Sequence, residues 1–425
     1  MRAPPKLKEL HRYPVVAGVG LASIGVTLAW WAKVDISPLF ETAMIRRGEL
    51  WRLVTSMFPH VNAMHLIFNV YWLWVFGTLI EEVYGHLKTA ALIVLLAAGS
   101  GALEYAFADG GVGLSGVGYG LFGLLWVLSE SDEHFKEAVD RRTVELFVVW
   151  FFICIVTTVT KIMPVANIAH GAGAVLGALT GFAITRPPQR TLAALGICAI
   201  LGFGLWADTV GRPRVNLSAH AGYEEAQLGY AAMEAKEYQV AVRWLRDAVV
   251  YQPKEAGFWS NLGFTYWNLG DKSASLAAYR KAAELGDAKA AYYLGSLYAN
   301  GQEGLKKDEA QALAWYVRAA NQGNAEAMNN AAWTYATSDD SALRNPAAAL
   351  DYARKAVDQN KEHPKASHLD TLAEAYYVNG KYEDAVKTEE QAMTLAPDNQ
   401  LREFQARLEK YLKAARGQKG NAKTE

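Results

Sequence analysis

Ser115 is a single hydroxyl in the glycine-rich, otherwise apolar segment 113–120. A serine among glycines four apart is also common where two membrane helices pack closely, so Ser115 alone indicates no more than packing. Other apolar segments, however, contain His65, Asn69 and His170. Polar and ionisable groups are costly at membrane depth and usually face a bundle interior or a wet cavity. Together they supply a nucleophile, a base and hydrogen-bond donors for an oxyanion, which acyl transfer requires.

The residue pattern gives no indication of a metal or a cofactor. His60 and His65 are five apart, not the four of a helical ligand pair, and no carboxylate or cysteine accompanies them. Cys154 and Cys198 both fall in apolar runs, which predicts buried thiols and no disulfide. The chain has 42 basic and 43 acidic side chains, and this balance argues against a nucleic-acid partner. We therefore expect no metal, no cofactor and no nucleic acid.

The segments that must position these groups are apolar runs of membrane-spanning length. Such runs cover 13–32, 64–80, 89–107, 110–128, 146–160 and 166–185. The predicted fold class is therefore all-α: a polytopic bundle of six membrane helices over residues 13–187, followed by a seventh spanning helix over residues 188–210. His65, Ser115 and His170 fall near the starts of the second, fourth and sixth helices. These helices begin on one face of the membrane, so we expect the three residues to converge.

The basic residues of segment 1–12 predict a cytoplasmic amino terminus, because basic residues tend to stay inside. The candidate groups then lie toward the outer face of a bacterial-type inner membrane. The seventh helix decides where the rest of the chain lies. If it spans, as we expect, the second half of the chain is periplasmic or extracytoplasmic; if it lies flat, that half is cytosolic.

After a linker at 211–218, residues 219–417 consist of helical repeats. Trp259, Leu262, Gly263 and Tyr266 have the spacing of the tetratricopeptide signature, and the third of five units resembles the Sel1-type variant. Stacked repeats share a continuous core and a concave groove. The predicted architecture is an α-solenoid with a capping helix at 401–415 and a disordered tail at 418–425.

The repeats do not gather a nucleophile with a base, so we expect them to be an interaction surface for an unknown protein or peptide ligand. We expect solvated surface positions for His220, His363 and His368. We expect core positions, because of their helical spacing, for Tyr292, Tyr293, Trp315 and Tyr316.

The segment 45–185 resembles the rhomboid family of intramembrane serine proteases through motifs that occur in order: Trp51-Arg52, His60, His65, Asn69, Gly113-Leu114-Ser115-Gly116, Tyr119, His170 and Gly173. The resemblance implies that Ser115 is the nucleophile and His170 its base, in a dyad without an acid. It also implies that Tyr119 packs on the imidazole and orients it. Gly113, Gly116 and Gly173 would support the dyad, the last two by letting the fourth and sixth helices approach closely.

The resemblance further implies that His65, Asn69 and the backbone N–H of Ser115 bind the oxyanion. Trp51, Arg52 and Glu81 match family positions with a structural role. His60 has no such assignment, and we expect it to reach toward water from its loop.

The leading hypothesis is an intramembrane serine endopeptidase that hydrolyses a peptide bond of single-pass or polytopic membrane protein substrates near the outer face of the lipid bilayer. A second hypothesis is a catalytically inactive rhomboid-like scaffold that binds membrane clients. A third is a polytopic scaffold or transporter whose polar groups line a pathway.

Overall fold

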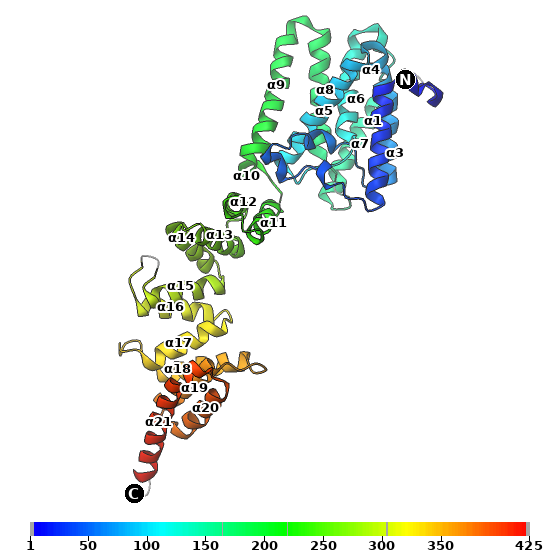
Figure 1. Cartoon of the computed structure of the whole chain (residues 1–425). Helices are drawn as coiled ribbons and strands as arrows, with labels where there is room; N and C mark the ends of the chain where they lie inside the picture. Colours follow the sequence, from blue (N-terminus) through cyan, green and yellow to red (C-terminus); the bar gives the residue numbers. More distant parts are fainter. Residues whose placement is uncertain (1–3, 164, 219, 303–304, 422–425) are drawn as a thin grey trace. The chain divides into compact units, whose positions relative to one another are not determined.

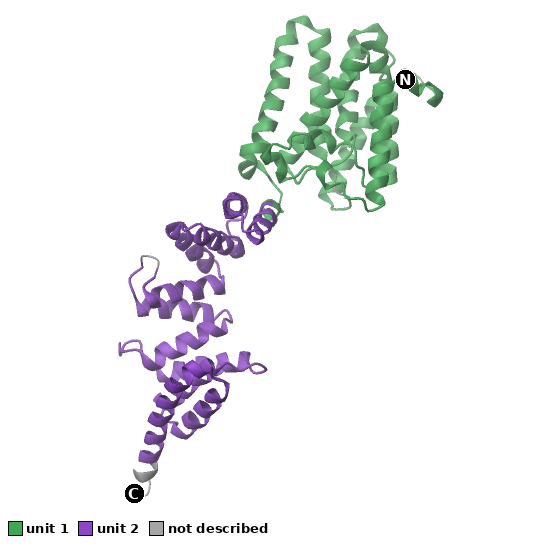
Figure 2. Cartoon of the chain, viewed as in Figure 1, with its two compact units in different colours: residues 1–224 green, residues 225–425 purple. Residues whose placement is uncertain are grey.

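The computed structural model describes residues 4–163, 165–218, 220–302 and 305–421. All regular secondary structure in these ranges is helical, as the predicted fold class requires. The chain divides into two compact units, Met1–Glu224 and Glu225–Glu425 (Figure 2). Each is described by itself below.

The first unit is a bundle of long apolar helices (Figure 1). The long helices are α1 (Pro14–Trp31), α3 (Ala63–Trp72), α4 (Thr78–Tyr84), α5 (His86–Phe107), α6 (Ser115–Ser131), α7 (Arg141–Val159), α8 (Asn167–Thr185) and α9 (Arg190–Trp206). Single π-helical turns, η4 (Leu73–Gly77) and η7 (Ala207–Gly211), join α3 to α4 and α9 to α10 (Arg212–Val215). Short helices lie between them: η1 (Leu7–Arg12), η2 (Ser37–Leu39), η3 (Ala43–Arg47), α2 (Arg52–Thr55), η5 (Glu133–Phe135) and η6 (Pro187–Gln189).

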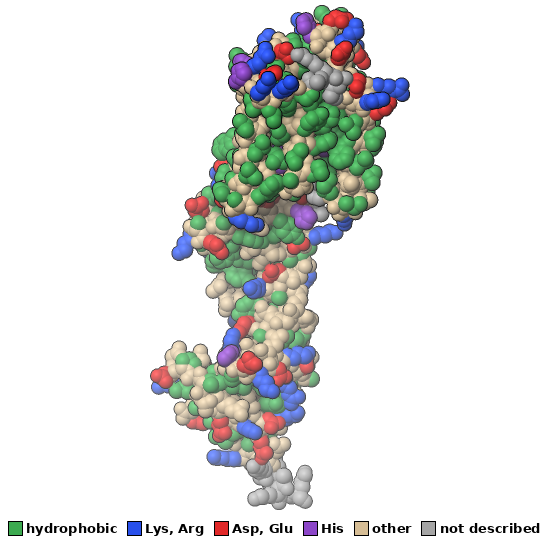
Figure 3. Space-filling model, turned by 90° about the vertical axis from the view of Figure 1, so that its right-hand side faces the viewer, with side chains coloured by type: hydrophobic (Ala, Val, Ile, Leu, Met, Phe, Trp, Pro, Cys, Tyr) green, Lys and Arg blue, Asp and Glu red, His purple; other side chains and the backbone are tan. Residues whose placement is uncertain are grey.

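Six helical segments of the described chain are long and apolar enough to cross a membrane: 14–31, 63–84, 86–107, 141–159, 167–185 and 187–215. Helix α6 is the remaining predicted span; it has only 17 residues, most of them buried. Apolar side chains on the other helices face outward: the exposed fraction is 66% for Ile67 on α3, 61% for Phe152 on α7 and 73% for Leu192 on α9. Figure 3 shows apolar side chains covering one face of this bundle, with charged side chains gathered at its ends. This distribution suits a bundle surrounded by lipid.

Two predicted boundaries and one predicted burial in this unit are wrong. Helix α6 begins at Ser115 and not at 110, because the chain runs as a loop through 108–114. The seventh segment continues to Val215, so the predicted linker at 211–218 is helical over its first five residues. Pro213 does not end the helix there, because it lies in the first turn after η7, where a missing N–H is tolerated. Cys198 is exposed on α9, unlike buried Cys154, because an outward-facing helix presents apolar residues to lipid.

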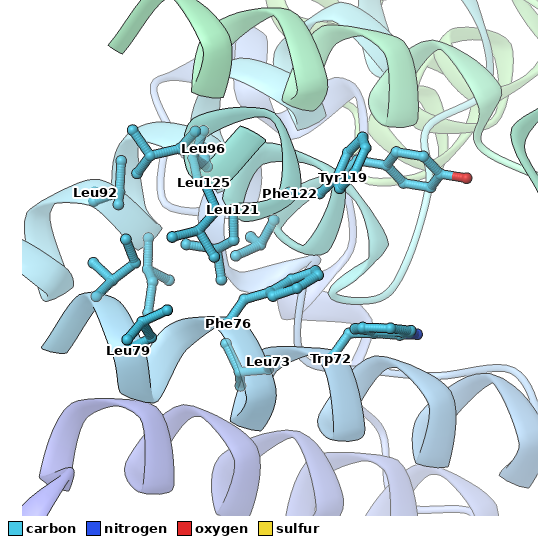
Figure 4. Close-up of a cluster of buried hydrophobic side chains, with 14 of the residues drawn as sticks. Trp72, Leu73, Phe76, Leu79, Leu92, Leu96, Tyr119, Leu121, Phe122 and Leu125 are labelled. Carbon is cyan, nitrogen blue, oxygen red and sulfur yellow. The ribbon is translucent and has the colours of Figure 1, made fainter. Parts of the chain in front are cut away.

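The core of the bundle surrounds α6. Buried leucines and aromatic rings from η4, α5 and α6 interlock there, among them Leu73, Phe76, Leu96 and Leu121 (Figure 4). Helices α6 and α8 cross with their backbones in contact. A Cβ on Gly173 would overlap the carbonyl oxygen of Gly116, so only small residues permit this crossing.

The second unit consists of five helix pairs and a final helix, as the repeat pattern predicts. The pairs are α11 (Tyr223–Glu234) with α12 (Tyr238–Tyr251), α13 (Ala256–Asn268) with α14 (Lys272–Glu284), α15 (Ala288–Asn300) with α16 (Glu309–Ala320), α17 (Ala325–Thr337) with α18 (Pro346–Gln359), and α19 (Ala366–Val378) with α20 (Tyr382–Leu395). The last helix, α21 (Asp398–Asn421), is longer than predicted, so 418–421 are helical, and the rest of the predicted tail, 422–425, lies outside the described residues.

The predicted aromatic core of the repeats is present. Tyr316 is buried, and Tyr292, Tyr293 and Trp315 pack against the same cluster. The prediction for His368 is wrong, because its side chain is buried between helix pairs, 3.2 Å from Glu326 Oε2. His220 and His363 are exposed as expected.

Candidate active site

Ser115 is the first residue of α6 and follows the loop 108–114. Gly113 has φ +108°, and a Cβ there would lie 2.6 Å from His65 Cε1, so this position requires glycine. Backbone hydrogen bonds fix the end of the loop: Gly113 N–H donates to Ser56 O at 3.0 Å, and Leu114 N–H donates to His60 Nε2 at 3.3 Å. The serine side chain is half-buried.

The N-terminus of α6 lacks a side-chain cap. In contrast, Asn62 accepts a hydrogen bond from His65 N–H at the start of α3, and Asp140 accepts one from Thr143 N–H at the start of α7. At α6 the N-cap residue is Leu114, whose side chain cannot accept. The first N–H groups of α6, including that of Ser115, therefore keep their capacity to bind a developing negative charge.

His60 is fully buried, so the expectation that it reaches toward water is wrong. Its Nδ1 lies 2.9 Å from Phe58 O, while Nε2 accepts from Leu114 N–H, which together require a neutral ring protonated at Nδ1. Burial, reinforced by the nearby His65, lowers the pKa of His60 to about 4, in agreement with that state. His60 is thus a buried anchor for the loop that carries Ser115.

His170 and Tyr119 are stacked, with ring centroids 4.6 Å apart and an interplanar angle of 23°. Tyr119 O–H donates to Phe147 O at 3.2 Å, which fixes the tyrosine ring. His170 is buried, and its Nδ1 has no hydrogen-bond partner within the described ranges. Ser115 and His170 share no hydrogen bond in the part of the chain that the structure describes. Catalytic hydrogen bonds are often long without substrate, so the dyad stays a prediction.

Asn69 and His65 lie one turn apart on α3. Asn69 is buried, and its Nδ2 donor group has no partner among the described residues. The His65 ring is half-buried and packs edge-on against His60, with centroids 4.9 Å apart. A buried amide donor without an acceptor is costly unless a ligand supplies one, which fits the predicted role of Asn69 as an oxyanion donor.

A small cavity of about 20 Å³, enough for one water molecule, lies beside Ser115. It is lined by Ser115, Gly116, Ser56, Ser100, Glu41 and Glu104. Sequence reasoning missed the two carboxyls, because nothing in the sequence places them beside the serine.

Each of these carboxyls ties two segments together. Glu41 Oε2 accepts from Gly111 N–H at 2.9 Å, and Ser56 Oγ–H donates to Oε1 at 2.9 Å. Burial raises the pKa of Glu41 to about 8, although these two hydrogen bonds oppose the shift. Glu104 Oε2 accepts from Ala169 N–H at 2.9 Å, which links α5 to the start of α8 beside His170.

The three residues predicted to be structural make no side-chain hydrogen bond to loop 108–114 among the described residues. Arg52 is buried and donates to Ser37 O at 2.7 Å and to Phe40 O at 3.0 Å, which orders the loop before α2. Glu81 is buried and accepts from Val15 N–H and Val16 N–H, both at 3.0 Å, at the start of α1. Trp51 is 53% exposed. Arg52 and Glu81 thus each connect two segments of the bundle, and their structural role stays a prediction.

Residues 47–187 match the rhomboid domain family, and this range contains Ser115, His170, His65 and Asn69. The chain contains a rhomboid domain. In its second half, residues 288–324 and 325–361 match the Sel1 repeat and residues 256–285 match the tetratricopeptide repeat. With its apolar helices, the rhomboid domain makes this chain a multi-pass membrane protein.

Curated relatives share the rhomboid domain. The rhomboid protease GlpG of Yersinia pseudotuberculosis is 30% identical over 145 residues, which are 34% of this chain and 51% of the relative. The rhomboid protease GlpG of Salmonella paratyphi A is 29% identical over 178 residues, which are 41% of this chain and 62% of the relative. The chain thus spans about half to three-fifths of the length of these relatives. A crystal structure of a Sel1 repeat protein from Oxalobacter formigenes has a TM-score of 0.35 at 22% identity, covering 43% of this chain and 76% of that chain.

Proposed function

We propose that the rhomboid domain is an intramembrane serine protease with Ser115 as nucleophile and His170 as general base. The observation that carries the proposal is the stacking of Tyr119 on His170. Tyr119 lies one helical turn after Ser115, so the stacking brings the imidazole to the helix that begins with the serine. The tyrosine ring, held by its bond to Phe147 O, orients the base in place of a carboxylate.

In the proposed reaction, the His170 imidazole takes the proton of Ser115 Oγ as the oxygen attacks the scissile carbonyl carbon. The resulting oxyanion accepts hydrogen bonds from Asn69, His65 and the uncapped N–H of Ser115. The imidazolium then gives its proton to the leaving amine, which breaks the peptide bond. Water hydrolyses the acyl-serine ester in a second step with the same base.

The proposed substrates are single-pass or polytopic membrane proteins. Because α6 begins at Ser115 within the bundle, a substrate backbone must leave its own helix to present a carbonyl there. Helices with glycine, proline or other helix-weakening residues near the outer boundary of the membrane open at least cost and are the expected targets.

The proposed partner of the second unit is a protein or peptide bound by the stacked repeats, in keeping with the Sel1 and tetratricopeptide matches. We place the amino terminus in the cytoplasm of a bacterial cell and take the segment 187–215 as a full span of the inner membrane. The repeats, which follow this span, then lie on the periplasmic side. Protease protection of the repeats in sealed vesicles of known orientation tests this placement.

The test of the proteolytic activity uses the full chain in proteoliposomes with a fluorescent single-pass reporter. We expect Ser115→Ala and His170→Ala to abolish cleavage, and a fluorophosphonate to label Ser115 in wild type but not to label either variant at this site. Ser129→Ala, on the same helix but with its hydroxyl bonded to Trp126 O, is the matched control and should cleave normally. Cleavage by Ser115→Ala would contradict the proposal, and an unlabelled wild type without activity would favour a client-binding scaffold.

A further inference from the structure

The seventh helical segment ends against the C-terminal end of α5. Arg212, in α10, is buried with an exposed fraction of 3%. Its Nε–H donates to Tyr105 O at 3.0 Å, and its Nη2 donates to Ala108 O at 3.2 Å. The guanidinium carbon also lies 3.9 Å from the centroid of the Tyr105 ring. An arginine buried in this way is anchored by two carbonyls and one aromatic face.

Asn216 continues the same contact one turn later. Its Nδ2 donates to Ala108 O at 2.8 Å, and the next residue, Leu217, donates its backbone N–H to Phe107 O at 2.9 Å. The last carbonyls of a helix have no partner within the helix and need one from elsewhere. For α5 these partners come from residues about a hundred positions later in the chain.

The end of α5 matters because it is also the start of the loop that leads to Ser115. Ala108 is the first of only seven residues between α5 and the serine. The middle and the far end of this loop are already fixed, through Glu41 to Gly111 and through His60 to Leu114. Arg212 and Asn216 fix the remaining end.

Burial raises the pKa of Glu41, the carboxyl that accepts the hydrogen bond from Gly111 N–H, and the charge of Arg212 opposes this shift. Arg212 also lies outside the matched rhomboid range 47–187. The contact is therefore made by the segment that joins the rhomboid domain to the repeats.

We propose that Arg212 and Asn216 are positioning residues for proteolysis, which hold the start of loop 108–114 so that Ser115 is placed for attack. This inference rests on the proposed function of Ser115. In this inference the seventh helical segment contributes to the placement of Ser115, in addition to connecting the rhomboid domain to the repeats.

The test compares full-length Arg212→Ala and Asn216→Ala with Arg214→Ala in proteoliposomes. Arg214 is a matched control, because it lies in the same short helix with the same charge but is exposed. Rates are expressed per mole of folded protein, measured by size-exclusion chromatography and thermal unfolding, so that unfolded protein is not counted. We expect kcat to fall about tenfold or more for Arg212→Ala, and less for Asn216→Ala, with KM unchanged. Arg212→Lys, which keeps the charge and one donor, should recover part of the rate, and Arg214→Ala should stay near wild type.

A residue that only stabilised the fold would lower the folded fraction and leave the rate per folded molecule unchanged, and that result would overturn the inference. Should Arg212→Ala fail to fold, Asn216→Ala decides alone, because Asn216 is only partly buried. A rate per folded molecule within about twofold of wild type for Asn216→Ala would then overturn it. A separate reaction with Ser115→Ala distinguishes failure of this inference from failure of the proposed function. Cleavage by Ser115→Ala would contradict the proposed function of Ser115 as the nucleophile.

Discussion

The contact between α6 and α8 predicts that Gly173→Ala nearly abolishes activity. An ideal Cβ on Gly173 would overlap the carbonyl oxygen of Gly116 and would lie 3.0 Å from its carbonyl carbon and 3.3 Å from Gly120 N. These are backbone atoms of a packed helix, which cannot turn aside as a flexible side chain does. The helices must therefore separate.

The size of the separation follows from ordinary contact distances. Two carbon atoms pack at about 3.5–4.0 Å, so the carbon contact alone pushes α8 away from α6 by about 0.5–1.0 Å, and relief of the oxygen overlap adds to this. His170 is on α8 and Ser115 is on α6, so the shift acts directly on their separation. A misplacement of about 1 Å can cost about a hundredfold in rate, and we expect a loss of that order in kcat.

The assay measures reporter cleavage in proteoliposomes and fluorophosphonate labelling of Ser115, together with the thermal unfolding of each variant. Gly171→Ala is the matched control, because its Cβ would meet only the Phe151 ring at 3.8 Å, an ordinary contact. Each glycine-to-alanine substitution stabilises helix α8 by about 1 kcal/mol through its higher helix propensity. This contribution is the same for both variants and does not affect their comparison. Cleavage by Gly173→Ala within about threefold of Gly171→Ala would refute the reasoning about the helix contact.

Three further predictions concern other parts of the chain. Asn69→Ala should lower kcat by about 10²–10³ with little change in KM, measured by reporter cleavage, because it removes one oxyanion donor. The folded-state pKa of Glu41, about 8 against an ordinary 4.5, means that the native state holds a proton that the unfolded state loses. The stability of the rhomboid domain should then fall as pH rises between these values, by up to about 5 kcal/mol, and Glu41→Gln should flatten the pH profile of thermal unfolding. Tyr411→Ala should destabilise the repeat unit by about 3–5 kcal/mol in a denaturant titration, because the ring is buried against Tyr377, whereas exposed Lys413→Ala should not.

The helices of both units could be predicted from the sequence because their signals are local. An apolar run of bilayer length or a tetratricopeptide spacing is written within one segment, and the positions of Ser115, His170 and Tyr316 followed from such segments. The exception, the extension of the last apolar segment past Pro213, depended on a π-helical turn that no residue pattern indicates.

Long-range partners could not be predicted in the same way. His60 contacts Leu114, which is 54 positions away, and His368 contacts Glu326, which is 42 positions away. Both histidines looked like surface residues because their neighbours in sequence are polar or lie in loops. The same limit applies to Glu41, whose hydrogen-bond partners in two other segments place it beside the serine.

The uncapped N-terminus of α6 explains how a dyad without a carboxylate could function. In a triad the acid stabilises the imidazolium that forms when the base takes the serine proton. In the proposed mechanism, the negative partner of that charge is the oxyanion, which would form at the positive end of the α6 dipole, beside N–H groups that the side chain of Leu114 leaves available. Tyr119 would then supply orientation, and the helix end would supply the electrostatic stabilisation. A capping residue such as aspartate at position 114 would fill those N–H groups and place a negative charge beside the oxyanion, so Leu114→Asp should lower kcat more than the isosteric, neutral Leu114→Asn does.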